Sequence, residues 1–559
     1  MLHATGDLLT IDVGARETSV EPIDDVLETY VGGRGVGTRL AHERIPFDVG
    51  PFGDANSLFF TTGPLQISQM SFTGRMNLTG VSPLTDGLLS SNAGGYMSRH
   101  FADTGYAAVQ ITGQSDDLLA IDVTDEGVSF EPVPSLREAR VDETTAYMDR
   151  EHDLGADQLA IVGPAGENRV RFAAVMTSES RAFGRGGLGA VMGSKNVKAV
   201  SFDGDSRPDI EVSDVQTDVH RDAATSDSIM KEQGTASLVD LTNEMAGYPT
   251  RYFRDRSFES ADRINGARIA EKKYKTGSCS LCAFACKLPT RDDERGVETE
   301  GPEFETTMSF GSNQAVDDIV DVMISNELCD QLGLDTISAG DVIAAYLAAE
   351  DEFGNAELAH ELIEKIAHRE DEGDLLAEGV DRIHDELGVK NWSVKGLEFP
   401  AHEGRLLHGQ ALGYMTANRG ADHLYSTFYA YEYPLVGEDE AFDPAGLEGK
   451  PEKLVWAENK RAVEDLGVIC RFSRGSMDAD RFEALYEDDF EALLDVGANV
   501  IDLERHFNNE RGMDRSDDDA LPYDVPGIDA ALSEYYDLRG WADDGTVPEE
   551  DVSYLDVSG

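Results

Sequence analysis

The segment SCSLCAFACKLP, residues 278–289, holds three of the five cysteines of this 559-residue chain, in the spacing C-x2-C-x3-C. Three thiolates this close in sequence can bind a metal, but a closed metal site needs a fourth ligand. The fold must therefore bring another part of the chain to Cys279, Cys282 and Cys286. This requirement constrains the fold more than any other feature of the sequence.

The spacing favours an iron–sulfur cluster over structural zinc. A zinc site usually pairs two C-x2-C elements or adds histidines at short spacing. Here the third cysteine, which we interpret as helical, leaves the group in need of one distant thiolate, and this is a common iron–sulfur arrangement. The candidates for the fourth ligand are Cys329 in NELCDQLG and Cys470 in GVICRF, and spacing does not choose between them.

The chain is strongly acidic, with a formal net charge of -61. Acidic residues are scattered through segments such as RDDERGVETE and EHDLGADQLA, whereas an acidic docking surface or a nucleic-acid mimic would need them concentrated. Dispersed charge favours a surface that stays hydrated at molar salt, where the Debye length is about 3 Å. We therefore expect a protein of a salt-adapted organism, and the lack of a basic face argues against nucleic-acid binding.

The first residues, MLHATGDLLTIDVG, lack the basic start and apolar run of a signal peptide. No stretch of the sequence reaches membrane-spanning length. Clustered cysteines in a long chain suit metal binding in a reducing compartment better than a disulfide framework. These observations predict a cytoplasmic protein without a membrane partner.

The hydrophobic pattern changes along the chain. Up to about residue 205, short β-type runs such as SLFFTTGPL and QLAIVG are separated by glycines. After the acidic stretch DGDSRPDIEVSD, apolar residues recur three and four apart, and a Pro-containing break near LEFPAHEGR precedes another helical section. The sequence predicts an α+β fold, with a β-rich N-terminal domain (1–205) and two mainly α-helical domains (206–395, with the first three cysteines, and 396–559, with Cys470).

Three segments of the β-rich part combine glycine with arginine or a polar side chain: FTGRMN (72–77), SSNAGGY (90–96) and RAFGRGGLGAVMGSKN (181–196). Glycine lets the backbone approach a ligand, and the guanidinium groups of Arg75, Arg181 and Arg185 match phosphate oxygens. GRGGLGAVMG is not a dinucleotide-binding fingerprint, because the acidic residue expected about 20 positions later is not convincingly placed. Each segment alone is explained by tight turns and surface arginines, and the three together raise the alternative of a phosphate-bearing cofactor.

Taken together, these segments resemble the aldehyde ferredoxin oxidoreductase family of tungsten enzymes. The resemblance extends nearly end to end, from GDLLTIDV and GGRGVGTRLAHE through TGRMNLTGVSPLTDG, RGGLGAVMGSKN, ETEGPEFE, CDQLGLDTIS and ALGYMTANRG to the late YYDLRGW. It implies that the β-rich domain is a base for a tungsten bis-pterin cofactor, covered by the helical domains. It also implies that only the pterin dithiolenes bind the tungsten.

The resemblance assigns Cys470 as the fourth ligand of a [4Fe–4S] cluster with Cys279, Cys282 and Cys286, and leaves Cys329 as a small buried residue. It implies that Mg²⁺ bridges the pterin phosphates. The positions that match the pterin-binding residues are Arg75, Asn92, Gly94, Arg181, Ala182, Gly184, Arg185, Asp330, Leu334, Asp335, Arg419, Asp465 and Ile469.

This sequence departs from the family pattern in three places. The motif D-x-x-G-L-C is DLGVIC here, with the glycine one place early, so the local turn is expected to differ. Tyr425 replaces a lysine two residues after the active-site histidine. Ile324 and Glu327 replace the E-x-x-H pair that holds a bridging iron between subunits, so a homodimer is expected to lack that iron.

The implied reaction is oxidation of an aldehyde with water to the carboxylic acid, with electrons passing through the cluster to ferredoxin. Glu305 and His423 match the active-site pocket and are candidates for water activation and proton transfer. The alternatives are a sister activity on a phosphorylated or short aldehyde, a molybdenum form, or a non-catalytic iron–sulfur electron carrier. The sequence does not identify the aldehyde.

Overall fold

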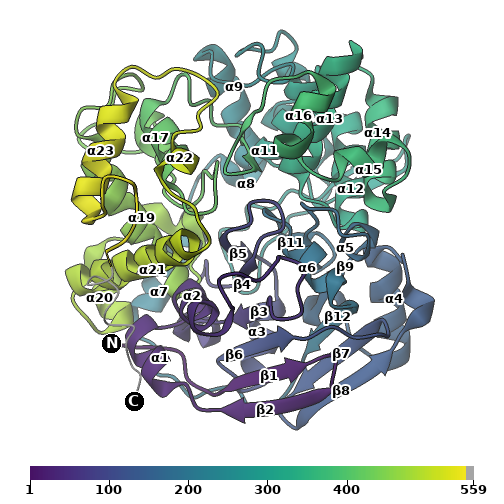
Figure 1. Cartoon of the computed structure of the whole chain (residues 1–559), viewed down its shortest axis with the longest axis vertical. Helices are drawn as coiled ribbons and strands as arrows, with labels where there is room; N and C mark the ends of the chain where they lie inside the picture. Colours follow the sequence, from purple (N-terminus) through teal and green to yellow (C-terminus); the bar gives the residue numbers. More distant parts are fainter. Residues whose placement is uncertain (549–559) are drawn as a thin grey trace.

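The computed structural model describes residues 1–548, and its N-terminal part is built on two six-stranded sheets (Figure 1). The first sheet has the order β2-β1-β6-β3-β4-β5 and the second β11-β10-β9-β12-β7-β8. The first consists of β1 (Leu8–Asp12), β2 (Glu17–Glu21), β3 (Leu58–Thr61), β4 (Met76–Val81), β5 (Leu88–Ala93) and β6 (Ala108–Thr112). The second consists of β7 (Leu119–Thr124), β8 (Gly127–Pro132), β9 (Leu159–Val162), β10 (Val175–Thr177), β11 (Arg181–Phe183) and β12 (Val197–Phe202).

The two sheets share one apolar core. Side chains of β1, β3, β4 and β6 pack with those of β7, β9, β10 and β12 in a single cluster. Phe60 of β3 meets Phe202 of β12 with ring centroids 5.5 Å apart. The edge strand β2, with sequence ETSVE, is fully exposed, and its charged residues protect that edge from pairing with another chain.

Short helices complete the N-terminal part, and α2 ties it to the C-terminal helices. Arg34 in α2 donates from Nε and Nη2 to the two carboxylate oxygens of Glu504, each over 2.8 Å. Both side chains are buried, so this bidentate pair fixes the position of the two parts relative to each other. The helices are α1 (Asp24–Tyr30), α2 (Gly33–Arg44), α3 (Met97–Asp103), α4 (Val141–His152), α5 (Pro164–Glu167) and α6 (Leu188–Ser194).

The middle part of the chain is helical, apart from the small hairpins β13 (Thr290–Asp292) with β14 (Val297–Thr299) and β15 (Ser393–Val394) with β16 (Leu397–Glu398). Asp318 and Asp335 cap two of its helices by accepting hydrogen bonds from Val320 N and Ser338 N. The helices are α7 (Val215–Thr225), α8 (Met230–Gln233), α9 (Leu238–Glu244), α10 (Gly266–Lys272), α11 (Phe304–Ser309), α12 (Ile319–Leu332), α13 (Thr336–Glu350), α14 (Ala356–His368), α15 (Glu372–Leu376) and α16 (Val380–Leu387).

The last part contains the longest helix, α21, which packs against α19 and α2. Its helices are α17 (His408–Thr416), α18 (Tyr429–Glu432), α19 (Lys450–Leu466), α20 (Ala479–Tyr486), α21 (Phe490–Glu510), α22 (Arg515–Asp518) and α23 (Ile528–Arg539). Figure 1 shows the sheets in the lower part of the view, with α12 to α16 above them on the right, α17, α22 and α23 above them on the left, and α20 and α21 beside them on the left.

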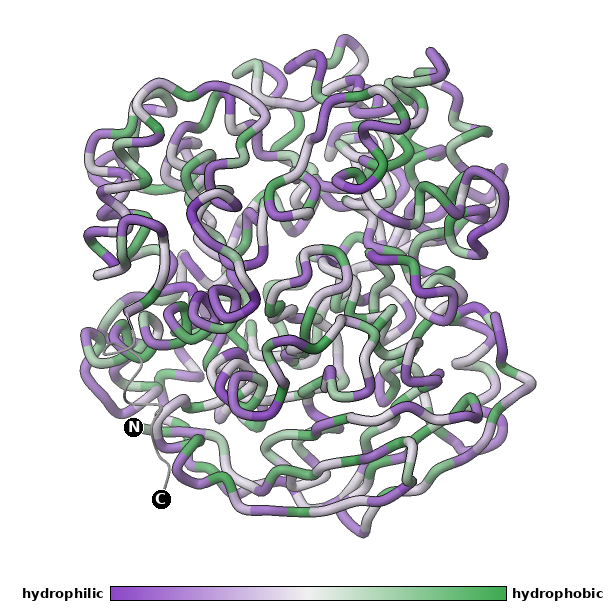
Figure 2. The backbone as a smooth tube through the Cα atoms, in the orientation of Figure 1, coloured by the Kyte–Doolittle hydropathy of each residue, from purple (hydrophilic) through white to green (hydrophobic). Residues whose placement is uncertain are grey.

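The predicted α+β class, a β-rich N-terminal domain followed by mainly helical domains, is confirmed. The domain boundaries at residues 205 and 395 stay predictions. Hydrophilic residues recur around the whole periphery in Figure 2, as the dispersed acidic residues of the sequence suggest. None of the helices within residues 1–548 is long and apolar enough to cross a membrane.

Candidate active site

A cavity of about 320 Å³ lies where the β-rich part meets both groups of helices. Its wall contains the cysteine segment, the starts of α11 and α13, and loops that carry His423 and Cys470. Nearly all residues that the sequence singled out meet here. The predicted residues that line the cavity are Arg75, Asn92, Gly94, Arg181, Ala182, Gly184, Arg185, Cys279, Cys282, Cys286, Glu305, Asp330, Leu334, Asp335, His423 and Cys470.

The cysteine segment is a loop, so the helix expected at its third cysteine is wrong. Reciprocal backbone hydrogen bonds of 3.1 and 3.2 Å between Gly277 and Lys287 close its neck. Within it, Leu281 and Ala285 have φ values of 54° and 47°. The backbone turns back twice between the cysteines, and a helix cannot do this because its residues all keep negative φ. The turns bring all three cysteines to the cavity.

The N-terminal domain positions the fourth cysteine. Cys470 N donates to Phe72 O over 2.7 Å, and Ala283 N in the cysteine loop donates to Ser71 Oγ over 3.0 Å. A Cβ on Gly94 would lie 3.0 Å from Cys279 Sγ, so glycine lets the sulfur approach the backbone. The cysteine loop and Cys470 are therefore both held against the N-terminal domain, through Ser71, Phe72 and Gly94.

Burial raises the pKa of Cys282, and it raises that of Cys286 to about 12. Thiols in this environment lose their protons readily only to a metal, so the donor set fits an iron–sulfur cluster. Cys329 differs from the four, since it is fully buried in α12 within the helical core.

The arginines of the cavity fit an anionic cofactor. Arg75 donates from Nη2 to Asn92 O over 2.8 Å, and Arg185 donates from Nη1 to Ala421 O over 3.0 Å. The Nε atoms of both arginines are buried without a hydrogen-bond partner in the part of the chain that the structure describes. Unpaired donors on positive groups suit phosphate oxygens.

The remaining arginine of this set, Arg181, forms an ion pair with Glu300. Burial raises the pKa of Asp330 well above its usual range, which favours the protonated form of this side chain as a hydrogen-bond donor. Asp335 lies 3.8 Å from Arg185 and caps α13. A ligand in the cavity therefore meets both hydrogen-bond donors and hydrogen-bond acceptors.

Three predicted cofactor-binding residues lie outside the cavity wall. Arg419 donates to Asp422 over 2.7 Å and to Ser90 O over 2.8 Å, so much of its guanidinium is already paired. Asp465 accepts from Asn92 Nδ2 over 2.7 Å and reaches the cavity only through that side chain. Ile469 is buried in the core against α20 and α21. Their cofactor contacts stay predictions.

The lysine-to-tyrosine departure changes more than charge. The Tyr425 hydroxyl is hydrogen-bonded to the Ser90 backbone over 3.2 Å, and the Arg34 guanidinium carbon lies 3.7 Å from the centroid of its ring. The side chain is buried and lies outside the cavity wall. Tyr425 thus packs between Arg34 and the Ser90 backbone and does not reach the cavity.

The displaced glycine also has a structural effect. In DQLGLD, Gly333 adopts the left-handed φ of 76°. The equivalent position in DLGVIC is Val468, which takes the same region with φ of 47°. A β-branched residue in this conformation is strained. Gly467 has an ordinary φ of -93°, but a Cβ there would lie 2.2 Å from Tyr486 Oη.

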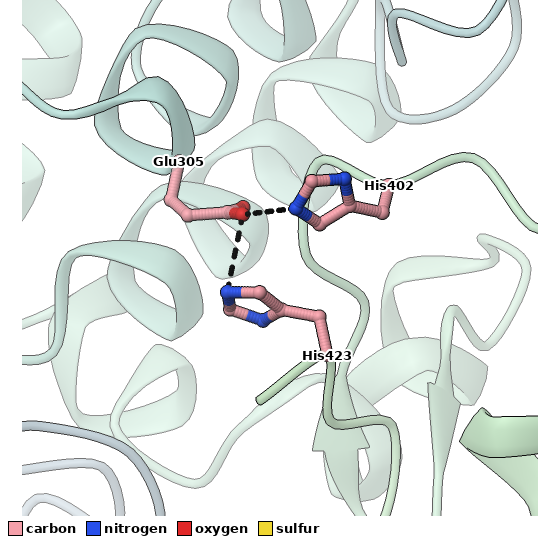
Figure 3. Close-up of side chains that lie close together, drawn as sticks. All are labelled: Glu305, His402 and His423. Carbon is pink, nitrogen blue, oxygen red and sulfur yellow. Dashed lines mark ion pairs between the residues drawn. The ribbon is translucent and has the colours of Figure 1, made fainter. Parts of the chain in front are cut away.

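Glu305 and His423, the two predicted catalytic residues, lie together, and the structure adds His402 to them (Figure 3). Glu305 Oε1 lies 3.3 Å from Nε2 of each histidine. Glu305 belongs to the first turn of α11, and the histidines come from loops. Its other oxygen accepts from Ala401 N over 2.6 Å. We call these three residues the Glu–His cluster.

The pKa shifts of its three members determine the protonation state of the Glu–His cluster. Burial would raise the pKa of Glu305, but His423, His402 and the Ala401 N–H together lower it to about 2. Burial lowers the pKa of His402, and it lowers that of His423 well below the usual range. Near neutral pH the cluster is therefore one carboxylate between two neutral imidazoles. Both Nδ1 atoms are buried and without a partner among residues 1–548.

His402 and Arg471 are two of the ionisable wall residues that sequence reasoning did not single out. His402 follows β16 and Pro400, and its ring stacks on Tyr429 with centroids 3.5 Å apart and planes 7° apart. No spacing links His402 to Glu305 or His423. The only available signal was a histidine directly after the Pro-containing break, LEFPAHEGR.

Comparison with known proteins identifies the family of this chain. The model of the aldehyde ferredoxin oxidoreductase N-terminal domain matches residues 8–204, and the model of domains 2 and 3 of the same family matches residues 212–557. The tungsten-containing aldehyde ferredoxin oxidoreductases of Thermococcus kodakarensis and Pyrococcus furiosus are each 32% identical to this chain, over 99% of both sequences.

A solved structure supports the fold. The active-site complex BamBC of benzoyl coenzyme A reductase superposes with a TM-score of 0.84 at 21% identity, covering 98% of this chain and 96% of that one. The two family models together cover both the β-rich and the helical parts of the chain. This chain belongs to the aldehyde ferredoxin oxidoreductase family.

Proposed function

We propose that this protein is a cytoplasmic tungsten enzyme that oxidises an aldehyde with water to the carboxylic acid and passes the electrons to ferredoxin. The observation that carries the proposal is that the Glu–His cluster lines the same cavity as four cysteines and four arginines. The 32% identity to tungsten-containing relatives, over 99% of both sequences, supports it.

The residues present fit the groups that this activity needs. Cys279, Cys282, Cys286 and Cys470 would hold a [4Fe–4S] cluster. Arg75, Arg181 and Arg185 would bind the pterin phosphates, and Asn92 would offer an amide oxygen to Mg²⁺. Asp330 and Asp335 would bind the pterin. When bound, the tungsten bis-pterin supplies a Lewis acid and a two-electron acceptor, and the cluster relays single electrons.

The Glu–His cluster handles protons. The reaction converts RCHO and H₂O into RCOOH, two protons and two electrons, so a proton must leave the water as its oxygen bonds to carbon. Glu305 is ionised and holds both imidazoles through their Nε2 atoms. His423 and His402 are neutral and each keep an unpartnered Nδ1 that can take up a proton. The adjacent carboxylate stabilises the imidazolium that then forms.

A non-catalytic electron carrier is the main alternative from another class. Such a protein needs the cysteines but has no use for unpaired buried arginine donors or for the Glu–His cluster. A molybdenum form and a sister activity on a phosphorylated or short aldehyde remain alternatives within the family.

Metal analysis together with an aldehyde panel tests the proposal. Purified protein at molar salt, chosen because of the net charge of -61, should contain tungsten and about four irons per chain. It should reduce a viologen dye with aldehydes. Molybdenum in place of tungsten would identify the molybdenum form. Four irons with neither metal, and no dye reduction, would identify a carrier.

A further inference from the structure

His402 has a free ring nitrogen on the side that faces away from Glu305. Its Nε2 lies 3.3 Å from the Glu305 carboxylate, and its Nδ1 points away from that carboxylate (Figure 3). Nδ1 is buried and has no hydrogen-bond partner within residues 1–548. A buried polar atom without a protein partner is costly and needs an explanation. A proton that His402 takes up at Nδ1 must leave toward the groups on this side of the ring.

Tyr433 carries the next free polar atom. Its ring centroid lies 5.8 Å from that of His402, and its hydroxyl is buried without a partner in the described part of the chain. Three other rings contact His402, and among residues 1–548 none of them has a buried hydroxyl without a partner; they are Phe304, His423 and Tyr429. Tyr433 directly follows α18 and is not part of the cavity wall. It therefore lies behind the Glu–His cluster, outside the space for substrate and cofactor.

The carboxylate of Glu403 lies near the Tyr433 hydroxyl. Burial raises the pKa of Tyr433 well above its usual range, and the charge of Glu403 makes the next largest contribution. Glu403 accepts from Arg405 N over 2.9 Å, from Arg405 Nε over 2.7 Å and from Arg405 Nη2. A carboxylate has about four lone-pair sites, so one of them is left for another donor.

Glu403 also connects this region with the surface of the protein. Glu403 itself is buried, but the Arg405 side chain that it binds is 22% exposed. A second buried hydroxyl without a partner in the described chain, that of Tyr523, lies beside Gly404, where an added Cβ would be only 2.0 Å from it. Glycine at this position leaves room for a polar atom next to Glu403. Free polar atoms therefore recur from the Glu–His cluster to a partly exposed ion pair.

We propose that Tyr433 and Glu403 form the route by which protons leave the Glu–His cluster for the solvent. This inference rests on the proposed function, because only a reaction that releases protons in the cavity needs such a route. Oxidation of each aldehyde releases two protons and two electrons, and the electrons leave on the side of the four cysteines. Substrate and cofactor fill the cavity during turnover, so the protons need a path through its wall.

Tyr433 passes a proton without becoming ionised. A proton on His402 Nδ1 moves to Tyr433 Oη while the hydroxyl proton moves on to Glu403, directly or through one water molecule. The hydroxyl accepts and donates in the same step, which suits a phenol whose burial disfavours the ionised form. Glu403 then gives the proton to the solvent beside Arg405, and His402 is neutral again for the next turnover.

The test uses the metal-loaded holoenzyme with a saturating aldehyde. Tyr433→Phe keeps the ring and removes the hydroxyl. Its kcat should fall by about 10-fold, less than for a group that touches the reacting atoms, and kcat/KM should change less than kcat. The solvent deuterium isotope effect on kcat should rise above the wild-type value, because proton release becomes rate-limiting. Imidazole, a small proton carrier, should restore part of kcat.

Tyr431→Phe is the matched control. Tyr431 lies two residues earlier, within α18, and its ring contacts Phe428 and Lys453 rather than His402. This variant should keep the wild-type kcat and isotope effect. Wild-type values in Tyr433→Phe as well, or a loss in Tyr433→Phe that imidazole does not relieve, would overturn the proposal.

Glu403→Gln tests the second group of the route, since it keeps a side chain of similar shape beside Arg405 and removes the proton acceptor. It should also lower kcat and raise the isotope effect. The double variant of Tyr433→Phe and Glu403→Gln should be no slower than the slower single variant, because both groups act on one route. Losses that multiply in the double variant would give the two residues separate roles and would contradict a shared route.

A crystal structure of the holoenzyme gives a measurement that does not depend on turnover. Tyr433 Oη should be linked to His402 Nδ1 and to Glu403 by direct hydrogen bonds or by ordered water molecules. Apolar side chains in either gap would contradict the route.

Failure of the route and failure of the proposed function give different results. Wild-type enzyme that oxidises aldehydes, with a Tyr433→Phe variant indistinguishable from it, contradicts the route alone. Metal-loaded wild-type enzyme that oxidises no aldehyde contradicts the proposed function.

Discussion

The amide nitrogen of Cys470 lies 2.7 Å from the carbonyl oxygen of Phe72, and this hydrogen bond joins the last cysteine of the chain to the N-terminal domain. Arg75, three residues after Phe72, approaches the Cys470 sulfur to 4.0 Å. The short segment from Phe72 to Arg75 therefore contacts Cys470, a proposed cluster ligand, and also carries Arg75, a proposed phosphate ligand.

Cys470→Ala is expected to lose cluster iron and dye reduction, because three thiolates leave one iron of a [4Fe–4S] cluster without its protein ligand. Cys329→Ala is the matched control, since it removes a fully buried sulfur outside the cavity. It should keep the iron and the activity. Iron analysis and the spectrum of the reduced cluster measure both, and a Cys329→Ala protein without the cluster would contradict the assignment.

Glu305→Gln and His423→Asn should retain tungsten and iron but lower kcat by about 100-fold or more, the usual scale of general acid–base catalysis. Each substitution keeps a hydrogen-bonding group of similar size and removes the ability to exchange a proton at that atom. Steady-state rates with metal analysis on the same preparation separate lost chemistry from lost cofactor. Near wild-type rates in either variant would remove that residue from the mechanism.

His402 should act by holding Glu305 in its ionised form. His402→Phe keeps a ring against Tyr429 but removes the Nε2 contact with Glu305. The pKa of Glu305 should then rise from about 2, because burial is opposed by fewer favourable contacts. The acid limb of the kcat/KM profile should move to higher pH.

The control is His402→Gln, which can still donate a hydrogen bond to Glu305 and should show a smaller displacement of the pH profile. A role in packing alone predicts the same profile for both variants and for the wild type. Identical profiles in all three proteins would therefore contradict this role.

The His42–His506 contact should make the fold sensitive to acid. His42 Nε2 lies 2.9 Å from His506 Nδ1, and burial, with His506, lowers the pKa of His42 to about 4. The unfolded chain then binds one more proton than the folded chain between about pH 6.5 and pH 4. The free energy of unfolding should fall by up to about 3 kcal/mol over this window and level off below it.

The His42→Asn variant removes the His42 imidazole and keeps His506, so the difference between the two proteins reports the titration of the His42–His506 pair. Denaturant unfolding between pH 4 and 7.5 should show a shallower pH dependence for the variant. Parallel curves for the two proteins would mean that His42 does not contribute.

A dimer of this protein should contain no iron between its subunits. Glu327 Oε1 accepts a hydrogen bond from Gln331 over 3.0 Å, and Ile324 packs against the helical core and offers no lone pair. Glu327→Ala should therefore leave the iron content unchanged. An iron atom on the dimer axis, bound near Glu327 and located by anomalous scattering, would show that this prediction is wrong.

The sequence predicted the parts of the site that depend on local motifs. Glycines beside Arg75 and Arg185 let the backbone approach a ligand closely, and the spacing of three cysteines suits a metal site. Each of these signals lies within one short segment, so the sequence alone predicts it. His402 and Arg471 escaped because neither belongs to a spaced motif. Each reaches the cavity through the packing of loops onto Tyr429.

The strand and helix content could be predicted because glycine-separated β-type runs and helical periodicity are strong local signals. The cysteine loop could not, because its two positive φ values occur at Leu281 and Ala285, residue types that do not signal such turns. Arg419 similarly carries the charge expected of a phosphate ligand, but the nearby Asp422 already pairs with it.

The hydrogen bonds from the cysteine loop and from Cys470 to residues 71 and 72 have a consequence for the order of events during synthesis. Cys279, Cys282 and Cys286 leave the ribosome well before Cys470, and the turn at residues 71 and 72 that supports them is made earlier still. A nascent chain can thus present only an incomplete set of thiolates until its last third has docked. Iron incorporation should therefore be a late event, and truncated chains should be recovered without a stable cluster.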